Sequence, residues 1–522
     1  MKRVAVAGIL AVLLGSAVAI GAGAGTSELI DAVRHHDRAA VERLLQQKAN
    51  VNARQGDGAT ALHWAIQDDQ LELAGLLIRA GADVNAANDL GVTPLMVAAM
   101  NGNTAAIRAL LEGKANPNQA PPGRETPLML AAWTGQTAAV AALLDAGATI
   151  NGTESERQQT ALMWAAAQKH PAVVKLLVSR GADISARTKV TPPSGGRPSR
   201  DKAGYSALMF AARSGDVESA KILLDAGAKA SDASGDGMSA LTLATVRGHV
   251  PMALLLLERG ADANAAAPGY TALHWASGSW ETAFTTNDIT TDREGEQEWN
   301  ALVGLKTGKH DLVRSLLKHG ADPNARITVT PLRAGATRSP TLPELTGATP
   351  YLLAAMAGDT GLMTMLKEAG ADPSIVTKKK STALMAASGL GRILGENTVE
   401  EPKLLAAAQL ALQHGADVKA VDEYGNTALH YAAYHRLPTV VQVLVDRGAP
   451  LEVKNMFGET PLWAADLVIQ WFGGGTFKVV PTPTGDLLRK LGAKPIATPY
   501  EKRPADWPCN EIPPAIVPES CS

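Results

Sequence analysis

Apolar residues recur at helical spacing in the stretch from Thr60 to Gly91. Leu73, Leu76 and Leu77 form one apolar stripe on a helix with 3.6 residues per turn, and mostly small residues follow the threonine in T-A-L-H-W-A. Gly81 comes directly after the apolar stripe, and glycine adopts the left-handed backbone of a helix end without steric cost. Thr93 can then cap the next helix, whose first turn suits the proline that follows. The pattern predicts two short helices, a loop and a new helix start.

The same helix start recurs along nearly the whole chain. Its twelve positions are Ser27, Thr60, Thr93, Thr126, Thr160, Ser206, Ser239, Thr271, Thr349, Thr382, Thr427 and Thr460. Most neighbouring starts are 33 residues apart or within one residue of that spacing, a period typical of helical repeat arrays. Longer spacings indicate inserted loops near residues 187–203, 279–306, 327–347, 389–403 and 471–486.

The repeated sequence resembles the ankyrin repeat, whose signature is T-P-L-H-x-A followed by G-A-D-x-N. The resemblance covers residues 25–493 and implies an all-α solenoid of paired antiparallel helices with finger loops. Such helices are too short to persist alone in water, so each pair must pack against its neighbours. Lys48 and Lys114 depart from the pattern because they replace the helix-ending glycine, and we expect local fraying there.

The two ends of the chain predict export and a covalently closed tail. Residues 1–24 read as a secretory signal peptide, with Lys2 and Arg3 before an apolar run and cleavage after Ala19 or Ala24; an uncleaved membrane anchor is the alternative. We therefore expect a periplasmic or secreted protein. Residues 494–522 form a Pro-rich tail that holds the only two cysteines. In an oxidising compartment these cysteines most simply pair, which predicts a disulfide between Cys509 and Cys521.

Charge and motifs argue against nucleic-acid binding and catalysis. The formal net charge is only −2, with 49 basic and 51 acidic residues, so no overall field attracts phosphates. The chain contains neither H-E-x-x-H nor G-x-S-x-G nor a G-x-x-x-x-G-K-[ST] loop. We expect no enzyme activity, no catalytic residue, no cofactor and no metal.

The conspicuous polar and aromatic residues of the helix starts have structural interpretations. The resemblance implies that His63, His274 and His430 hydrogen-bond to backbone of their own and the neighbouring turn. The aromatic residues that follow this position should be buried between helices. They are Trp64, Trp164, Phe210, Trp275 and Tyr431.

The resemblance also implies a protein-binding surface made of finger tips and exposed first-helix positions. In the fingers the candidates are Asp57, Leu90, Arg124, Arg157, Lys202, Tyr205, Met238, Tyr270, Lys379, Tyr424 and Phe457. On the first helices they are Trp133, Arg213, Arg247 and Tyr434. Exposed aromatic and arginine side chains are the types that most often anchor protein interfaces.

The sequence therefore predicts an exported scaffold that binds one or more proteins noncovalently through its concave face and fingers, without stable membrane insertion after signal cleavage. Two other hypotheses stay open. One is an enzyme or ligand-binding protein whose site is formed by the insertions at residues 279–306 and 327–347, since inserted loops on a rigid scaffold often carry function. The other is a structural spacer of the cell envelope.

Overall fold

The computed structural model describes residues 28–190, 204–235, 237–267, 269–279, 305, 307–329, 345–391, 399–470 and 476–495, with backbone alone for 468–470 and 476–479. The predicted signal peptide, Lys202, the Cys509–Cys521 pair and most of the inserted loops lie outside these residues. The chain divides into two compact units, Met1–Ala228 and Lys229–Ser522.

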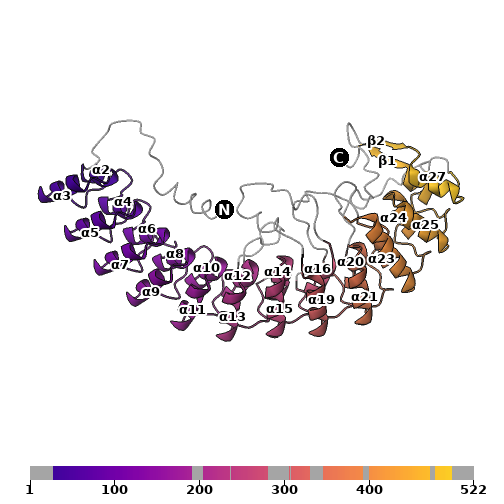
Figure 1. The fold of residues 1–522 in the computed structure, drawn as a ribbon, viewed down its shortest axis with the longest axis horizontal. Coiled ribbons are helices and arrows are strands. Elements are labelled where there is room, and N and C mark those ends of the chain that lie inside the picture. The colour runs from indigo at the N-terminus through magenta and orange to yellow at the C-terminus, as the bar shows by residue number, and fades with distance from the viewer. Residues whose placement is uncertain are drawn as a thin grey trace. The chain divides into compact units, whose positions relative to one another are not determined.

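Six helix pairs are described in the first unit. They are α2 (Glu28–Arg34) with α3 (Arg38–Gln46), α4 (Ala61–Gln67) with α5 (Leu71–Arg79), α6 (Pro94–Asn101) with α7 (Thr104–Glu112), α8 (Pro127–Thr134) with α9 (Thr137–Asp145), α10 (Ala161–Ala167) with α11 (Pro171–Ser179), and α12 (Ala207–Ser214) with α13 (Val217–Asp225). Each first helix packs against the next first helix, and each second helix against the next second helix, in chain order. Figure 1 shows the two resulting rows.

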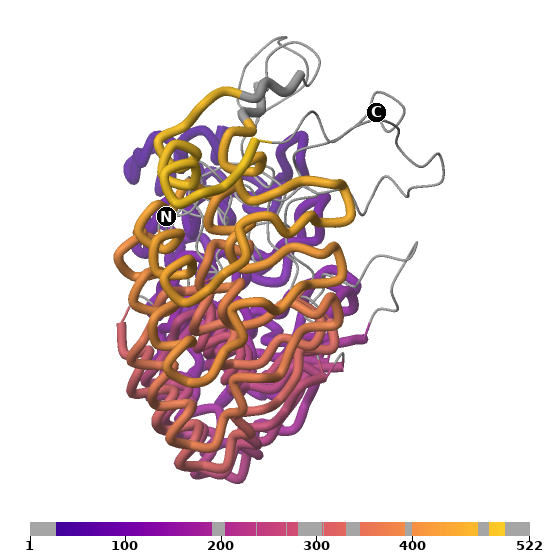
Figure 2. The backbone as a smooth tube through the Cα atoms, turned by 90° about the vertical axis from the view of Figure 1, so that its right-hand side faces the viewer, coloured from indigo at the N-terminus to yellow at the C-terminus, as the bar shows by residue number. Residues whose placement is uncertain are grey.

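Six more pairs are described in the second unit. They are α14 (Ala240–Val246) with α15 (Val250–Glu258), α16 (Ala272–Ser277) with α19 (Lys309–Lys318), α20 (Pro350–Met356) with α21 (Thr360–Glu368), α22 (Ala383–Ala387) with α23 (Glu401–Gln413), α24 (Ala428–Tyr434) with α25 (Pro438–Asp446), and α26 (Pro461–Asp466) with α27 (Pro483–Lys490). Figure 2 shows the later pairs, in orange, following one another layer by layer.

The predicted all-α class is confirmed by these helices, with one local exception. Strands β1 (Leu467–Gln470) and β2 (Thr476–Val479) form an antiparallel hairpin inside the insertion of the last pair. Two of the predicted insertions extend into helices of the array. The one placed at 471–486 contains β2 and the first turn of α27, and α23 begins at Glu401, inside the one placed at 389–403. Pro402 stands in the first turn of α23, where proline fits because the N–H it lacks would have no partner within the helix.

The apolar stripes form a continuous core within each unit. The leucine at the third position of the helix start is fully buried, as at Leu62, Leu128 and Leu384, and the second helices bury residues such as Leu77 and Leu110. Burying one leucine side chain contributes about 1.5–3 kcal/mol, and it does so here only because the next pair covers it. Stability therefore depends on neighbouring pairs.

Caps at the helix starts fix where each first helix begins. The hydroxyl of Thr93 accepts a hydrogen bond from the Met96 amide at 3.3 Å, and Ser206 and Thr460 cap α12 and α26 in the same way. A serine or threonine with extended backbone stands at the cap position of every first helix from α4 to α26. The predicted starts are thus confirmed at these helices.

The second helices end in the left-handed backbone that the sequence predicted. Gly81 and Gly448 have φ of 89° and 84°, and Lys48 and Lys114 adopt the same conformation with φ of 58° and 72°. The closing hydrogen bond from Ala115 N to Leu110 O remains at 2.9 Å, so the fraying expected at Lys114 is absent from the structure. The helix end closes because its backbone bonds outweigh the steric cost of one Cβ.

Asparagine side chains tie the ends of consecutive second helices together. Asn85 accepts from the Asn116 amide at 2.7 Å and donates to the Lys114 carbonyl at 3.2 Å. The asparagines at 52, 118, 264 and 324 each make the same pair of bonds to the end of the second helix of the following repeat. These bonds satisfy backbone groups that the helix ends leave without partners.

Candidate protein-binding surface

The loop between a second helix and the next first helix, which we call the finger, is closed by one polar side chain. Asn88 accepts hydrogen bonds from the amides of Leu90 and Val92 at 3.0 and 2.9 Å. Asp422 accepts from Tyr424 and Asn426 at 2.9 and 2.8 Å, and Glu154 and Asn455 close their fingers likewise. Each finger is therefore a defined turn whose tip residues are held in place.

Neighbouring fingers within a unit are also joined by backbone hydrogen bonds. In the first unit Asp89 N donates to Asp57 O at 3.0 Å, and Lys189 N donates to Arg157 O at 2.8 Å. In the second unit Met456 N donates to Tyr424 O at 2.8 Å. The fingers consequently form a ladder that holds several tips beside one another before any partner binds.

The three histidines of the helix starts have the predicted structural role. In His430 the Nδ1 atom lies 3.1 Å from Thr427 N, and Nε2 lies 3.1 Å from the Glu459 carbonyl of the next finger. His63 and His274 make the matching contacts to their own threonines and to the carbonyls of Val92 and Ala325. Burial lowers the pKa of His63, and lowers that of His274 and His430 to about 4, so all three are neutral near pH 7.

Most of the predicted binding residues reach the surface. Half-exposed or exposed side chains occur at Asp57, Leu90, Arg124, Trp133, Arg157, Tyr205, Arg213, Arg247, Lys379, Tyr424 and Tyr434. Leu90 is the apolar residue of this set that is most clearly at the surface, with 49% of its area exposed. These residues belong to two units.

Three of the predicted residues are buried, so their placement on the surface was wrong. Met238 and Phe457 are 5% and 8% exposed, and Tyr270 is 6% exposed with its ring 5.5 Å from that of Trp275. Phe457 is buried although the preceding residue, Met456, is 58% exposed. Two adjacent residues of a finger can differ in whether their side chains are buried or exposed, and residue composition does not reveal which is which.

The aromatic residues of the helix starts are buried only in part. Phe210 and Trp275 are 2% exposed as predicted, but Trp64, Trp164 and Tyr431 are half-buried. The Arg34 guanidinium lies 4.6 Å from the centre of the Trp64 ring, which shows that this ring accepts a cation on one face.

Contacts between adjacent fingers organise the tip residues of the second unit. The Lys379 ammonium lies 3.2 Å from Glu423 Oε2 and 5.4 Å from the centre of the Tyr424 ring. These two contacts hold Lys379, one of the predicted finger residues, against the neighbouring finger. The contacts hold the side chains of Lys379 and Tyr424 together, so that two adjacent fingers share one surface.

A buried hydrogen-bond network around the Asp422 carboxylate supports Tyr424. The Tyr431 hydroxyl donates to Asp422 Oδ2 at 2.6 Å, and burial raises the pKa of Tyr431 well above its usual value. Burial also raises the pKa of Asp422, although four hydrogen-bond donors surround its carboxylate. Sequence inspection missed this network because no spacing signal links residues of a finger to the fourth residue of the next helix.

A comparison with protein-family models decides the family. The model for ankyrin repeats in three copies matches residues 29–121, 115–188, 208–283 and 351–455, and the single ankyrin-repeat model matches residues 268–327. Together these matches cover more than half of the chain. The chain belongs to the ankyrin-repeat family.

Similar proteins share only part of their length with this ankyrin-repeat chain. Neurogenic locus notch homolog protein 1 from Homo sapiens is 33% identical over 144 residues, and its counterpart from Xenopus tropicalis is 32% identical over 176 residues. The matches cover 23% and 34% of this chain but 6% of each of those proteins. Among solved structures, the human ASB11 ankyrin repeat domain is 26% identical with a TM-score of 0.38, and the match covers 45% of this chain and 99% of that one.

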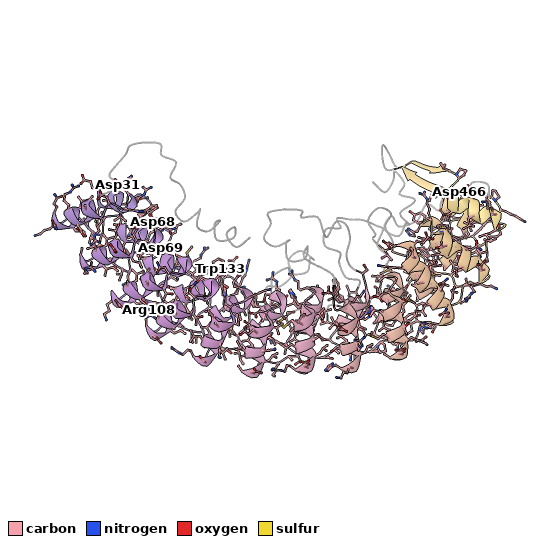
Figure 3. The ribbon with its side chains drawn as sticks, viewed as in Figure 1. Asp31, Asp68, Asp69, Arg108, Trp133 and Asp466 are labelled. Carbon is pink, nitrogen blue, oxygen red and sulfur yellow. The ribbon has the colours of Figure 1, made fainter. Side chains whose placement is uncertain are left out.

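Ankyrin repeats typically mediate protein–protein interaction and typically do so without catalysis, which is the function that the family supports. Figure 3 shows how the first unit presents its two sides: Asp31, Asp68 and Trp133 lie on the row of first helices, and Arg108 lies on the side of the second helices. Among the described residues, no group of three or more metal-ligating side chains occurs and no helix is long and apolar enough to cross a membrane.

Proposed function

We propose that this protein is an exported scaffold of twelve ankyrin repeats that binds one or more protein partners noncovalently. The binding surface consists of the first-helix row and the finger tips of each unit. One observation carries the proposal. Half-exposed aromatic and charged residues, such as Trp133, Tyr424 and Lys379, lie on elements that the protein itself already holds rigid.

Rigidity matters because association costs conformational freedom. Immobilising a flexible side chain costs about 0.5–1.5 kcal/mol, so a surface that is ordered beforehand loses less on binding. The Tyr424 finger is fixed by Asp422 within its own turn and by Met456 N from the next finger. Aromatic residues in such a setting combine a large contact area with few rotatable bonds.

Export is supported by the N-terminal sequence. Lys2 and Arg3 precede an apolar segment that ends in small residues, as a signal peptide requires. A periplasmic or secreted location fits the proposed disulfide between Cys509 and Cys521, and it places the partners outside the cytoplasm. N-terminal sequencing of the mature protein tests export: we expect a new N-terminus after Ala19 or Ala24, and an intact Met1 contradicts it.

Cross-linking mass spectrometry in the native compartment tests the binding surface. We expect cross-links from one or a few proteins to concentrate on fingers and first helices, including Lys379 and its neighbours Lys378 and Lys380. Lysines on the second helices, such as Lys175 and Lys221, serve as internal controls. Cross-links distributed evenly over both sets contradict the proposed surface.

A further inference from the structure

Three consecutive fingers of the second unit form one stretch of surface with a fixed spacing. They comprise residues 377–381, 422–426 and 455–459. Within each finger, the amide of the first residue donates to the carbonyl of the last at 3.0 or 3.1 Å. Between fingers, Glu423 N donates to Lys379 O at 2.9 Å and Met456 N donates to Tyr424 O at 2.8 Å. The three tips are therefore held beside one another by backbone bonds.

Lysine side chains dominate the charge of these tips. Lys378 and Lys380 are exposed on the first of the three fingers, and Lys454 is exposed directly before the third. Lys379 is less accessible, with 19% of its side chain exposed, because its ammonium contacts the neighbouring finger. Three lysines on adjacent fingers are thus available to a partner.

The acidic residues of the same fingers do not offer their carboxylates at this surface. Glu423 is engaged in the ion pair described above, and Asp422 and Glu459 are buried. Glu452 lies nearer the end of the preceding helix, where its carboxylate accepts a hydrogen bond from Lys494 N at 2.8 Å. A partner that approaches the tips therefore meets mainly positive charge.

Apolar side chains are exposed among these lysines. Met456 is 58% exposed on the third finger, and Val421, directly before the second finger, is 47% exposed. Methionine is flexible and polarizable, so it adapts to differently shaped apolar side chains of a partner. The surface accordingly combines positive charge with apolar contact area on a backbone that is already ordered, which lowers the cost of binding.

We propose that these three fingers, together with Lys454, bind an acidic segment of the protein partner. Carboxylates of that segment pair with Lys378, Lys380 and Lys454, and one of its apolar side chains covers Met456. This surface belongs to the binding face of the proposed function, on which the assignment rests, and the acidic segment is the chemistry of its partner.

The composition of the fingers favours carboxylates of a protein over phosphates. Residues 377–381, 422–426 and 455–459 contain no arginine, the side chain that binds phosphate through two parallel hydrogen bonds. A nucleic-acid backbone also offers no apolar side chain to Met456 and Val421. An acidic peptide with apolar residues satisfies both kinds of group.

Peptides selected from a random display library on the full-length protein test the assignment. We expect the enriched peptides to contain aspartate or glutamate next to leucine, phenylalanine or methionine. The double variant Lys378→Glu with Lys380→Glu should bind them about tenfold or more weakly, because it places repulsive charges opposite their carboxylates. Added salt should weaken binding to the unchanged protein, since the lysines are exposed and screened.

Two further variants serve as controls, with circular dichroism to show that every variant is folded. Lys175→Glu with Lys221→Glu makes the same change in net charge on second helices of the first unit, where both lysines are exposed. It should change peptide affinity by less than about twofold, because screening limits charge effects to short range. Met456→Gln should weaken binding several-fold and leave the salt dependence unchanged, since it removes apolar contact and no charge.

Three results overturn the assignment. They are selection of no peptide or of peptides without carboxylates, equal loss of affinity in the two double variants, and tighter binding of an oligonucleotide or an anionic vesicle to Lys378 and Lys380 than of the selected peptides. None of them contradicts the proposed function, which is tested separately by cross-links of the native partner to fingers and first helices.

Discussion

At the scale of single residues, the buried histidines couple stability to pH. The pKa of His430 is about 4 in the folded chain, against about 6.5 for an exposed histidine. As pH falls from 6.5 toward 4, the unfolded chain binds protons that the folded chain excludes, so stability is lost over this window and is fully present above it. One pKa unit corresponds to about 1.4 kcal/mol, which gives a loss of about 3 kcal/mol for His430.

The His430→Met variant isolates this effect because Met385 occupies the same position in another repeat, with its sulfur 3.5 Å from Thr382 N. At pH 7 we expect a loss of about 1 kcal/mol from the missing bond to Glu459. Toward pH 4.5 the difference from the unchanged protein should shrink or reverse. Denaturant unfolding at both pH values measures it, with Met385→Leu as the control that leaves the pH dependence unaltered.

Backbone strain at Lys114 gives a second prediction for a single residue. Lys114→Gly should stabilise the protein by up to about 1 kcal/mol, because glycine has no Cβ to strain a φ of 72°. Gly81→Ala is the matched control: its Cβ meets nothing within 4 Å, so strain alone should destabilise the protein. Thermal unfolding compares the two, and a neutral or destabilising Lys114→Gly contradicts the strain argument.

At the scale of elements, the asparagine ladder couples one helix end to the next. Asn85→Ala removes bonds to the Asn116 amide and the Lys114 carbonyl, and we expect a loss of about 1–2 kcal/mol. Exchange should accelerate first in α5 and α7. Ser231→Ala is the control, because Ser231 occupies the ladder position yet makes no side-chain hydrogen bond in the described chain. Equal effects of the two substitutions contradict a role for the ladder.

The elements also show what sequence can and cannot predict. Helix starts at Thr93 or Thr460 were predictable because a capping residue, an apolar stripe and a left-handed glycine recur at one spacing. The hairpin inside the last repeat was not, because residues 471–475 separate two short apolar strands that read equally well as a loop. Periodicity identifies the repeated helices and gives no information about the structure of inserted segments.

The binding surface was predictable by position and not by orientation. Leu90 and Tyr424 reach the surface as the resemblance implied, whereas Phe457, at the matching place in its finger, is buried. The difference comes from packing against neighbouring repeats, and a repeat consensus does not contain those neighbours. The contact between Lys379 and Tyr424 likewise joins residues 45 positions apart.

At the scale of the whole molecule, the two units are built by one rule. Each helix pair is too short to be stable alone and is held by the pair before and after it. Among the described residues, the same rule leaves side chains such as Trp133 on a first helix and Leu90 on a finger tip at least partly exposed. A recognition surface is thus a direct result of the way the chain folds, and it needs no cavity or reactive group.

The affinity of the cross-linked partner for two variants tests this account most directly. Trp133→Ala alters the row of first helices and Arg108→Ala alters the opposite side of the same unit, as Figure 3 shows. We predict that Trp133→Ala weakens binding by about tenfold or more and that Arg108→Ala changes it by less than about twofold, with both variants folded by circular dichroism. Weakened binding by Arg108→Ala alone would contradict recognition through the first-helix face.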